Sequence, residues 1–298
     1  MQIWLTTLGF GVIDAAVLAV AAVGFTLQFG VTNYVNFAYG ELITFGAFMA
    51  LMAGGHPFGL PIWQSLIVAA LLTGVLSFVV GRFVFTPFFQ RRPQLLFALA
   101  TTFAASLILS SIWAAVWGAQ YQELNYGGAD VHSVGPFIAT TAELLFVVVA
   151  AAALLGVHLL LTQTKLGRTM RAMADDRNLA IACGLNIRRT TNLTWLITGL
   201  LAGVAGVIQA MQVHTFNTNI GSTYVFLIIT AAVLGGIGRP YGAVIGAVII
   251  GVASQLAVLV VGAALSPVVV FVILVFLMVA RPTGIFGATG RTTAFGSA

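Results

Sequence analysis

The sequence predicts an all-α, polytopic membrane protein with about eight or nine transmembrane helices. Of its 298 residues, 60% are hydrophobic and only 6% are charged, and the mean hydropathy is +1.08. A soluble domain needs far more charge than this to solvate its surface. Apolar runs recur along nearly the whole chain and approach the roughly 20 residues that a helix needs to cross a bilayer. Residues 66–80 and 268–280 are apolar on every face, which excludes the alternating strands of a transmembrane barrel.

Nine apolar runs are the candidate spans. No basic segment or cleavage site accompanies the first, so we expect it to be retained. A turn, Gly30–Asn36, separates it from the second. The sixth and eighth carry small residues at helix-contact spacing, Gly199 with Gly203 and Gly242 with Gly246, which predicts close helix packing. In chain order the spans are 9–29, 37–54, 62–85, 95–117, 142–162, 191–211, 224–237, 241–262 and 266–280.

The seventh run differs from the others in length. Residues 224–237 are short for a crossing and end in the sequence GGIGRP. This segment near the C-terminal third is therefore predicted to be either a crossing or a broken or re-entrant element.

Basic residues are predicted to gather at one face of the membrane. The opposite-face segments 55–61, 117–141 and 212–223 contain no Lys or Arg but do hold Glu123 and Asp130. Because basic loops mark the cytoplasmic side, we expect the N-terminus outside and the C-terminus inside. Basic loops at one face of the membrane therefore account for the net charge of +5, and binding to nucleic acid is not needed to explain it. The 12 residues at the basic face are Arg82, Arg91, Arg92, Lys165, Arg168, Arg171, Arg177, Arg188, Arg189, Arg239, Arg281 and Arg291.

The longest polar stretch at that face, residues 164–190, exceeds what neighbouring helices need as a connection. Residues 166–174 predict a helix with Met170 and Met173 on one side and Arg168 and Arg171 elsewhere.

A second short helix, Asn178–Cys183, is predicted to follow, capped by Asp175 or Asp176 and ended by Gly184. Two interpretations are open for the pair. The helices could dock into a groove of a cytoplasmic partner, or they could lie on anionic lipid headgroups through their arginines.

Two segments together resemble the H-type permease subunit of branched-chain amino-acid ABC importers. One is LAVAAVGFTLQFGVTNYVNFAYGELITFGAF, and the other is LGRTMRAMADDRNLAIACGLNIRRTTNLTWLITGLLAGVAGVI. The stretch GGIGRPYGAVIGAVIIG and the terminal RPTGIFG are similar to further parts of that family. The resemblance implies a single permease domain over residues 1–298, in a bacterial inner membrane, with 164–190 as its cytoplasmic coupling loop.

The same resemblance implies that Asp175–Gly184 inserts into an ATPase subunit, although the family's common E-A-A-x-x-x-G form is degenerate here. The partners implied are an M-type permease, two ATPase subunits and an extracytoplasmic solute-binding protein. ATP and Mg would be bound by those ATPases, because the only lysine, Lys165, lies outside any P-loop motif. One cysteine, Cys183, excludes a Cys-based zinc site, and the four histidines are too scattered to indicate a metal. The candidate coupling residues are Arg168, Arg171, Asp175, Asp176, Arg177 and Gly184.

Glu41 is a carboxylate in an otherwise apolar segment, which costs about 3 kcal/mol at the bilayer centre. Asn36 could cap the second span near the cytoplasmic face, leaving Glu41 at the positive end of that helix. Alternatively the turn is buried at depth, and Asn33, Asn36 and Glu41 form a polar cluster that shapes the solute path. A third possibility is a proton-coupling carboxylate. The sequence alone leaves all three open.

Three other polar residues occupy or flank the spans. Gln209 and His214 could line the solute entrance, or could simply be interfacial. Asp14 faces water at the outer rim or pairs within the bundle. The translocation-path candidates are Asn33, Asn36, Glu41 and Gln209.

The leading function is therefore a non-catalytic permease subunit for branched-chain or other hydrophobic amino acids, with amides, urea or similar small organic solutes equally compatible. A self-sufficient secondary transporter or channel is the alternative, but only Asp14 and Glu41, with Glu143 at an edge, could couple ions inside the spans. An intramembrane hydrolase is excluded because neither H-E-x-x-H nor G-x-S-x-G is present.

Overall fold

The apolar runs form long helices in the computed structural model, which describes residues 2–55, 58–91, 95–124, 131–134, 137–262, 265–280 and 284–286. The helices are α1 (Gln2–Thr32), α2 (Tyr39–Gly54), α3 (Ile62–Val80), the π-helix η1 (Gly81–Phe85), α4 (Thr86–Arg91), α5 (Leu95–Trp117), α6 (Thr141–Gln163), α7 (Lys165–Asp175), α8 (Arg177–Ala182), α9 (Ile187–Val213), α10 (Ile220–Gly235), α11 (Pro240–Val261) and α12 (Ser266–Ala280).

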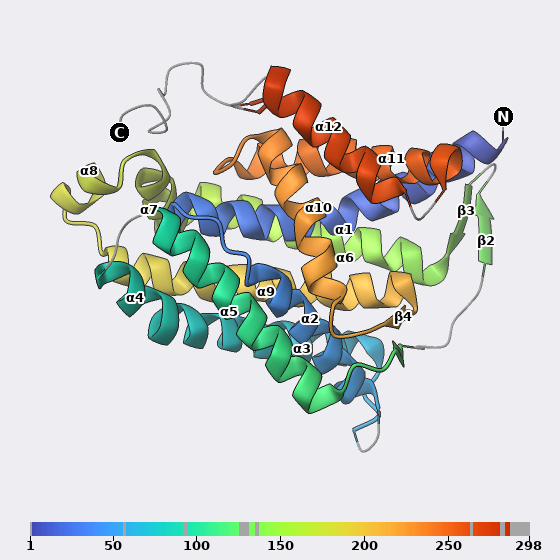
Figure 1. The fold of residues 1–298 in the computed structure, drawn as a ribbon, viewed down its shortest axis with the longest axis horizontal. Coiled ribbons are helices and arrows are strands. Elements are labelled where there is room, and N and C mark those ends of the chain that lie inside the picture. Colours follow the sequence, from blue (N-terminus) through green and yellow to red (C-terminus); the bar gives the residue numbers. More distant parts are fainter. Residues whose placement is uncertain are drawn as a thin grey trace.

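Six helical stretches within the described residues are long and apolar enough to cross a membrane, which confirms the predicted class of polytopic helical membrane protein. Two further apolar helices, α2 and α10, have only 16 residues each. At 1.5 Å per residue they extend about 24 Å, less than the roughly 30 Å of a bilayer core. The expected shortness of the seventh segment is thus confirmed. Figure 1 shows α10 crossing the bundle steeply relative to α1.

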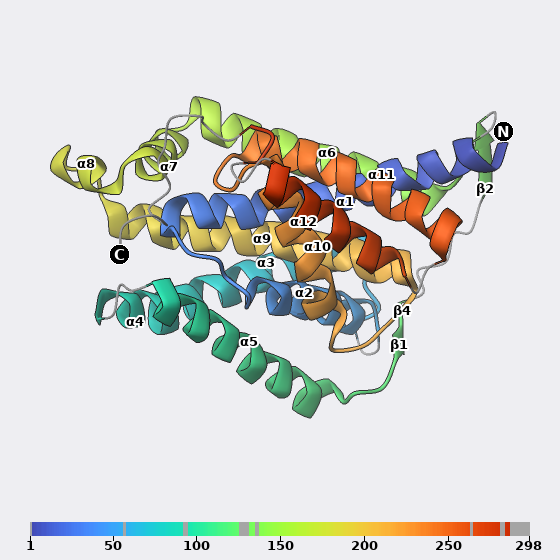
Figure 2. The same ribbon diagram turned by 45° about the horizontal axis from the view of Figure 1, so that its top comes forward.

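Helix α1 forms the centre of the bundle and packs against α6, α9, α10 and α11 (Figures 1 and 2). Its residues 17–23 are almost completely buried. The outward faces of α3, α5, α6 and α12 instead expose large apolar side chains, as expected where a helix meets lipid.

Small residues permit the closest helix contacts. A β-carbon on Gly203 would lie 2.8 Å from Ala70 Cα of α3, and one on Gly246 would overlap the carbonyl of Ala231 in α10. The glycine pairs of α9 and α11 therefore form packing seams, as their spacing predicted.

The third predicted span ends later than expected. Its helix continues from α3 through the π-helix η1 and α4 to Arg91, six residues beyond the predicted end at 85. The π-helix lies beside Trp195 of α9, whose ring stacks on Phe85 with centroids 5.2 Å apart. Gly81 is required at this contact, because a β-carbon there would overlap the Trp195 ring.

Short strands occupy the segments near the N-terminal end of α1. The strand β1 (Gln122–Glu123) pairs antiparallel with β4 (Thr215–Phe216), placing Gln122 opposite Phe216. The hairpin strands β2 (Val131–Val134) and β3 (Phe137–Thr140) pair Val131 with Thr140. Sequence reasoning did not predict these strands.

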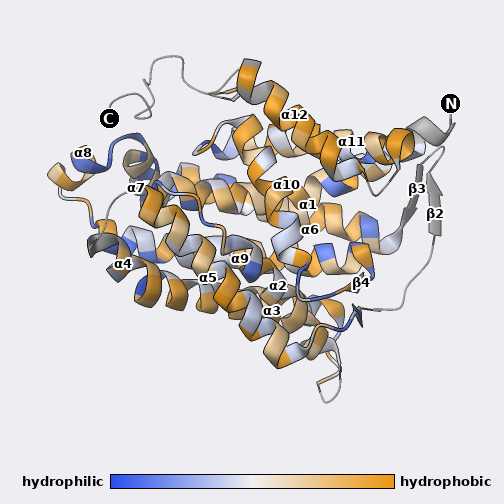
Figure 3. Ribbon diagram, viewed as in Figure 1, coloured by the Kyte–Doolittle hydropathy of each residue, from blue (hydrophilic) through white to orange (hydrophobic). Residues whose placement is uncertain are grey.

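The opposite end of the bundle carries the polar helices. Figure 1 shows α4, α7, α8 and the start of α9 gathered there, far from the N-terminus and the β2–β3 hairpin. Hydrophilic colouring is concentrated around α7 and α8, whereas the long helices are mainly hydrophobic (Figure 3). The described basic residues on these elements thus share one end of the molecule, as the sequence predicted.

Candidate functional site

Helix α7 is amphipathic and covers the end of the bundle. Met170 and Met173 are buried, whereas Arg168 and Arg171 are exposed. Gly167 allows the helix to turn back closely on α6, because a β-carbon there would overlap the carbonyl of Leu160. The predicted arrangement of this helix is confirmed, and its apolar side is already used for packing against α1 and α6.

Helix α8 has a well-defined beginning. The Asp176 carboxylate accepts hydrogen bonds from the backbone N–H groups of Asn178 and Leu179, at 2.8 and 3.0 Å. Of the two predicted caps, Asp176 is therefore the one used, and Asp175 is the last residue of α7.

Its end is equally defined. Gly184 has φ +75°, its N–H donates to the Ile181 carbonyl at 2.9 Å, and the Leu185 N–H donates to the Ala180 carbonyl at 3.1 Å. This pair of bonds is the Schellman arrangement, which favours glycine at the left-handed position.

The surface of α8 combines charge with exposed apolar side chains. Leu179 and Ile181 are 62% and 54% exposed, while Ala180 between them is buried against the bundle. Asp176 and Arg177 are also exposed. Because α8 projects beyond the other helix ends (Figures 1 and 2), these side chains are free to contact another molecule.

Glu41 lies in the first turn of α2 and is 0% exposed. Ser106 of α5 donates a hydrogen bond to its Oε1 at 3.1 Å. Its second oxygen, Oε2, has no hydrogen-bond partner among the described residues. The position near the positive end of a helix favours a negative charge.

Asn36 and Asn33 do not join Glu41 in one hydrogen-bonded cluster within the described part of the chain. Asn36 donates to Gln28 Oε1 at 3.3 Å and accepts from the Ala38 N–H at 3.1 Å. It therefore stabilises the turn before α2, whose N-cap is Ala38, and is not itself the predicted N-cap. Asn33 is exposed and ends α1 with φ +62°.

A polar and aromatic face of α5 covers α2. Thr102, one turn before Ser106, donates to the Val35 carbonyl at 3.1 Å. Two further residues on this face, Trp113 and Trp117, contact aromatic rings of α2, and the Trp117 ring stacks on Phe48 with centroids 4.6 Å apart. Figure 2 shows α5 at the edge of the bundle, so α2 is the main element behind this face.

The beginnings of α2 and α10 meet in the interior. Gly221 donates from its N–H to the hydroxyl of Thr44 at 3.1 Å, and a β-carbon on Gly221 would overlap the Gly40 carbonyl. Two short helices thus bring their N-terminal turns, and the partial positive charges of those turns, together at Gly40 and Gly221.

Other predicted residues lie elsewhere. Gln209 is half-buried on α9, and the structure does not bring it to Glu41. Asp14 is paired within the bundle: Gln212 of α9 donates to it at 3.0 Å, and Gln255 of α11 donates to its other oxygen. Sequence reasoning missed both glutamines, although an amide inside an apolar run was a usable signal.

Comparison with known proteins gives a consistent result. Residues 7–278 match the family described as branched-chain amino acid transport system / permease component. The chain is 30% identical to the "High-affinity branched-chain amino acid transport system permease protein LivH" of Salmonella typhimurium, with 93% of each chain covered. The Escherichia coli K12 protein of the same name is also 30% identical, again with 93% of each chain covered. The "High-affinity branched-chain amino acid transport system permease protein BraD" of Pseudomonas aeruginosa is 27% identical, covering 93% of this chain and 94% of its own.

Proposed function

Because the chain belongs to the family of branched-chain amino acid transport permeases, and is thus a permease subunit of an ABC importer, we propose that α8 couples it to a separate ATPase. The observation that carries this proposal is the exposed apolar pair Leu179 and Ile181 on a rigidly capped helix. Apolar anchors surrounded by charge are typical of a helix that docks into a groove on a partner.

The packing of α7 favours docking over a purely lipid-bound role for the helix pair. A surface-bound amphipathic helix turns its apolar side to lipid. Met170 and Met173 of α7 instead face the protein, and α8 extends away from the bundle. Arg168, Arg171, Asp175, Arg177 and Gly184 would accompany Asp176 as coupling residues, with the charges setting the orientation of docking.

We propose that α2, α5 and α10 form one wall of the solute path. Glu41, the converging helix beginnings and the aromatic face place a few polar groups in the otherwise apolar contact region between these helices. In transporters, such interrupted helices commonly surround the solute. The solute proposed is a branched-chain amino acid, because an apolar wall suits its aliphatic side chain and relatives carry that solute in their names.

The proposed assembly contains an M-type permease, two ATPase subunits that bind ATP and Mg, and an extracytoplasmic solute-binding protein. The basic end that carries α7 and α8 would face the cytoplasm of a bacterial cell, with the N-terminus of α1 outside. No catalytic step is assigned to this chain.

Reconstitution of the importer tests this function. Proteoliposomes with all subunits and external binding protein should take up labelled leucine only when ATP is enclosed, and an inactive ATPase variant should abolish uptake. Liposomes with this chain alone should transport nothing. Uptake by the chain alone under an ion gradient would instead identify a secondary transporter.

A further inference from the structure

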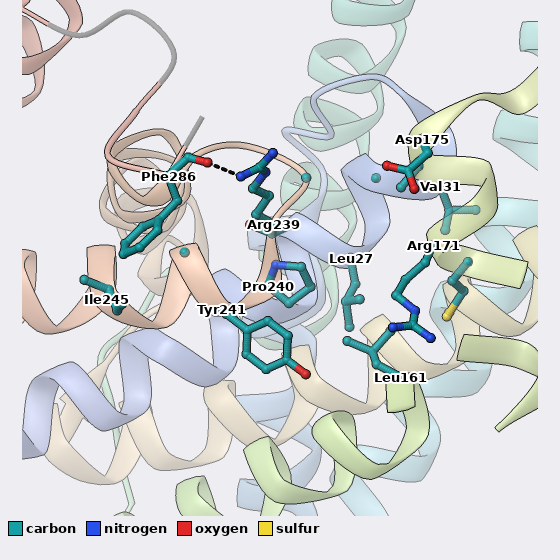
Figure 4. Close-up of a pocket in the computed structure, with 16 residues that line it drawn as sticks. Leu27, Val31, Leu161, Arg171, Asp175, Arg239, Pro240, Tyr241, Ile245 and Phe286 are labelled. Atoms are coloured by element: carbon teal, nitrogen blue, oxygen red, sulfur yellow. Dashed lines mark hydrogen bonds between the residues drawn. The ribbon is translucent and has the colours of Figure 1, made fainter. Parts of the chain in front are cut away.

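A cavity of about 380 Å³ separates α7 from the ends of α1, α6 and α11, at the basic end of the molecule (Figure 4). Its apolar walls include Leu27, Leu161, Met170 and Ile245. The proposed coupling role involves Arg171 and Asp175, which line this cavity, but it does not account for the cavity itself.

Two arginines from separate elements line the cavity: Arg171 of α7 and Arg239 of the turn between α10 and α11 (Figure 4). Asp175 is the one acidic side chain among the lining residues that the structure describes, so two positive charges meet one negative charge there. Arg239 donates one hydrogen bond to the Phe286 carbonyl, which fixes the position of its guanidinium. The other N–H groups of the guanidinium can donate to a ligand. The cavity therefore favours an anion.

Two hydroxyl groups add to this polar set. Thr26 of α1 is 0% exposed and lines the cavity, and its Oγ1 has no hydrogen-bond partner among the described residues. Tyr241 of α11 lines the cavity with its hydroxyl 2.9 Å from Nδ1 of His158. The Tyr241 hydroxyl is the exposed polar group of this pair, because Tyr241 is 55% exposed whereas Thr26 is covered.

The cavity also continues into a lipid-facing surface. Ile245, which lines it, is 41% exposed, and the next residues on the same face of α11, Val248 and Ile249, are exposed as well. A ligand bound by the arginines could thus extend an apolar chain along α11 into the bilayer.

We propose that this cavity binds the headgroup of an anionic glycerophospholipid. Arg171 and Arg239 hold the phosphodiester, and the Tyr241 hydroxyl accepts from His158 Nδ1–H and donates its own proton to a phosphate oxygen. An acyl chain lies along Ile245 and Val248. Basic pockets between transmembrane helices are suited to such headgroups. Because the lipid would bridge α7 and the start of α11, it would also set the position of α7, to which α8 is attached.

Photo-crosslinking of the unmodified chain tests the site directly. The full-length chain is placed in nanodiscs of phosphatidylcholine containing some phosphatidylglycerol with a photoreactive acyl chain, and crosslinked peptides are mapped by mass spectrometry. We expect label concentrated on residues 245–249, suppressed by excess phosphatidylglycerol and not by extra phosphatidylcholine. Labelling spread evenly over the lipid-facing helices α3, α6 and α12, or equal suppression by both lipids, would overturn the proposal.

Variants identify the groups that bind the phosphate. Arg171→Gln and Arg239→Gln should each lower crosslinking about fivefold, the effect of one basic residue near an anionic headgroup. Arg168→Gln is the matched control: it removes the same charge from α7, but Arg168 is exposed and does not line the cavity, so crosslinking should be unchanged. Wild-type labelling in both cavity variants would disprove the assignment. Equal suppression of wild-type labelling by soluble glycerol 3-phosphate would show a site for free phosphate compounds and reject the lipid.

Discussion

Replacing Gly184 tests the proposed coupling role of α8 through backbone geometry alone. Its φ is +75°, and no atom lies within 4 Å of the position that a β-carbon would take. Gly184→Ala therefore meets no steric clash within the chain, but it must adopt a left-handed conformation that costs about 1–2 kcal/mol. That cost lowers the ratio of intact to frayed helix ends by about 5- to 30-fold.

The assay is the ratio of solute taken up to ATP hydrolysed in the reconstituted importer. We expect Gly184→Ala to lower this ratio, because fewer molecules present α8 in the docked geometry. Gly184→Asn is the matched variant, since asparagine tolerates the left-handed region, and it should retain more coupling than alanine. Thermal unfolding of the bundle should be nearly unchanged in both, because Gly184 is exposed and touches no other element.

Two results would refute this reasoning. Wild-type coupling in Gly184→Ala would show that the Schellman end of α8 is not used in transport. Equal loss in the alanine and asparagine variants would show that the partner requires the absence of a side chain and not the positive φ.

A parallel test removes the N-cap at the other end of α8. Asp176→Ala should weaken α8 by about 1 kcal/mol, whereas Asp176→Ser keeps an N-cap oxygen.

Three further predictions concern topology, packing and the solute path. Cys183 is the only cysteine and is exposed, so a membrane-impermeant maleimide should label it in inverted vesicles and not in intact cells. Tyr121→Cys in a Cys183→Ser background should show the reverse labelling pattern. Labelling of Cys183 in intact cells would reject the proposed orientation. Gly221→Ala should lower stability by about 1–3 kcal/mol in thermal unfolding because its β-carbon overlaps α2, whereas Gly156→Ala, with open space at that position, should not lower it; equal stability of the two would argue against this contact. Glu41→Gln preserves the size of a buried side chain and removes its carboxyl group, so leucine uptake should fall without loss of thermal stability. Normal uptake would remove Glu41 from the path.

Hydrophobic pattern and local capping chemistry were enough to predict much of the fold. The helices α5 and α12 begin and end where the sequence predicted, at 95–117 and 266–280. The short helix α8 was also predictable, because Asp176 and Gly184 carry its caps within the same short segment. Both the hydrophobic pattern and the capping residues of a helix lie within one or two turns of the helix ends that they specify, so a short stretch of sequence is enough to recognise them.

Contacts between distant segments could not be predicted in the same way. Strands of two residues, such as β1 and β4, have no detectable alternation and form only because the two segments meet in space. The hydrogen bond to Glu41 comes from Ser106, 65 positions away, a partner that proximity in the sequence to Asn33 and Asn36 could not indicate. The cavity beside α7 likewise exists only after four separate helices have packed.

The central helix α1 is synthesised before the helices that pack around it. This helix is translated first, but the Gln255 amide that donates a hydrogen bond to Asp14 is added 241 residues later. At a translation rate of about 5–20 residues per second, the carboxylate waits roughly 12–48 s for that donor. A nascent chain interrupted before α11 would keep a half-satisfied acid in its first membrane segment, a defect that cellular quality control could recognise.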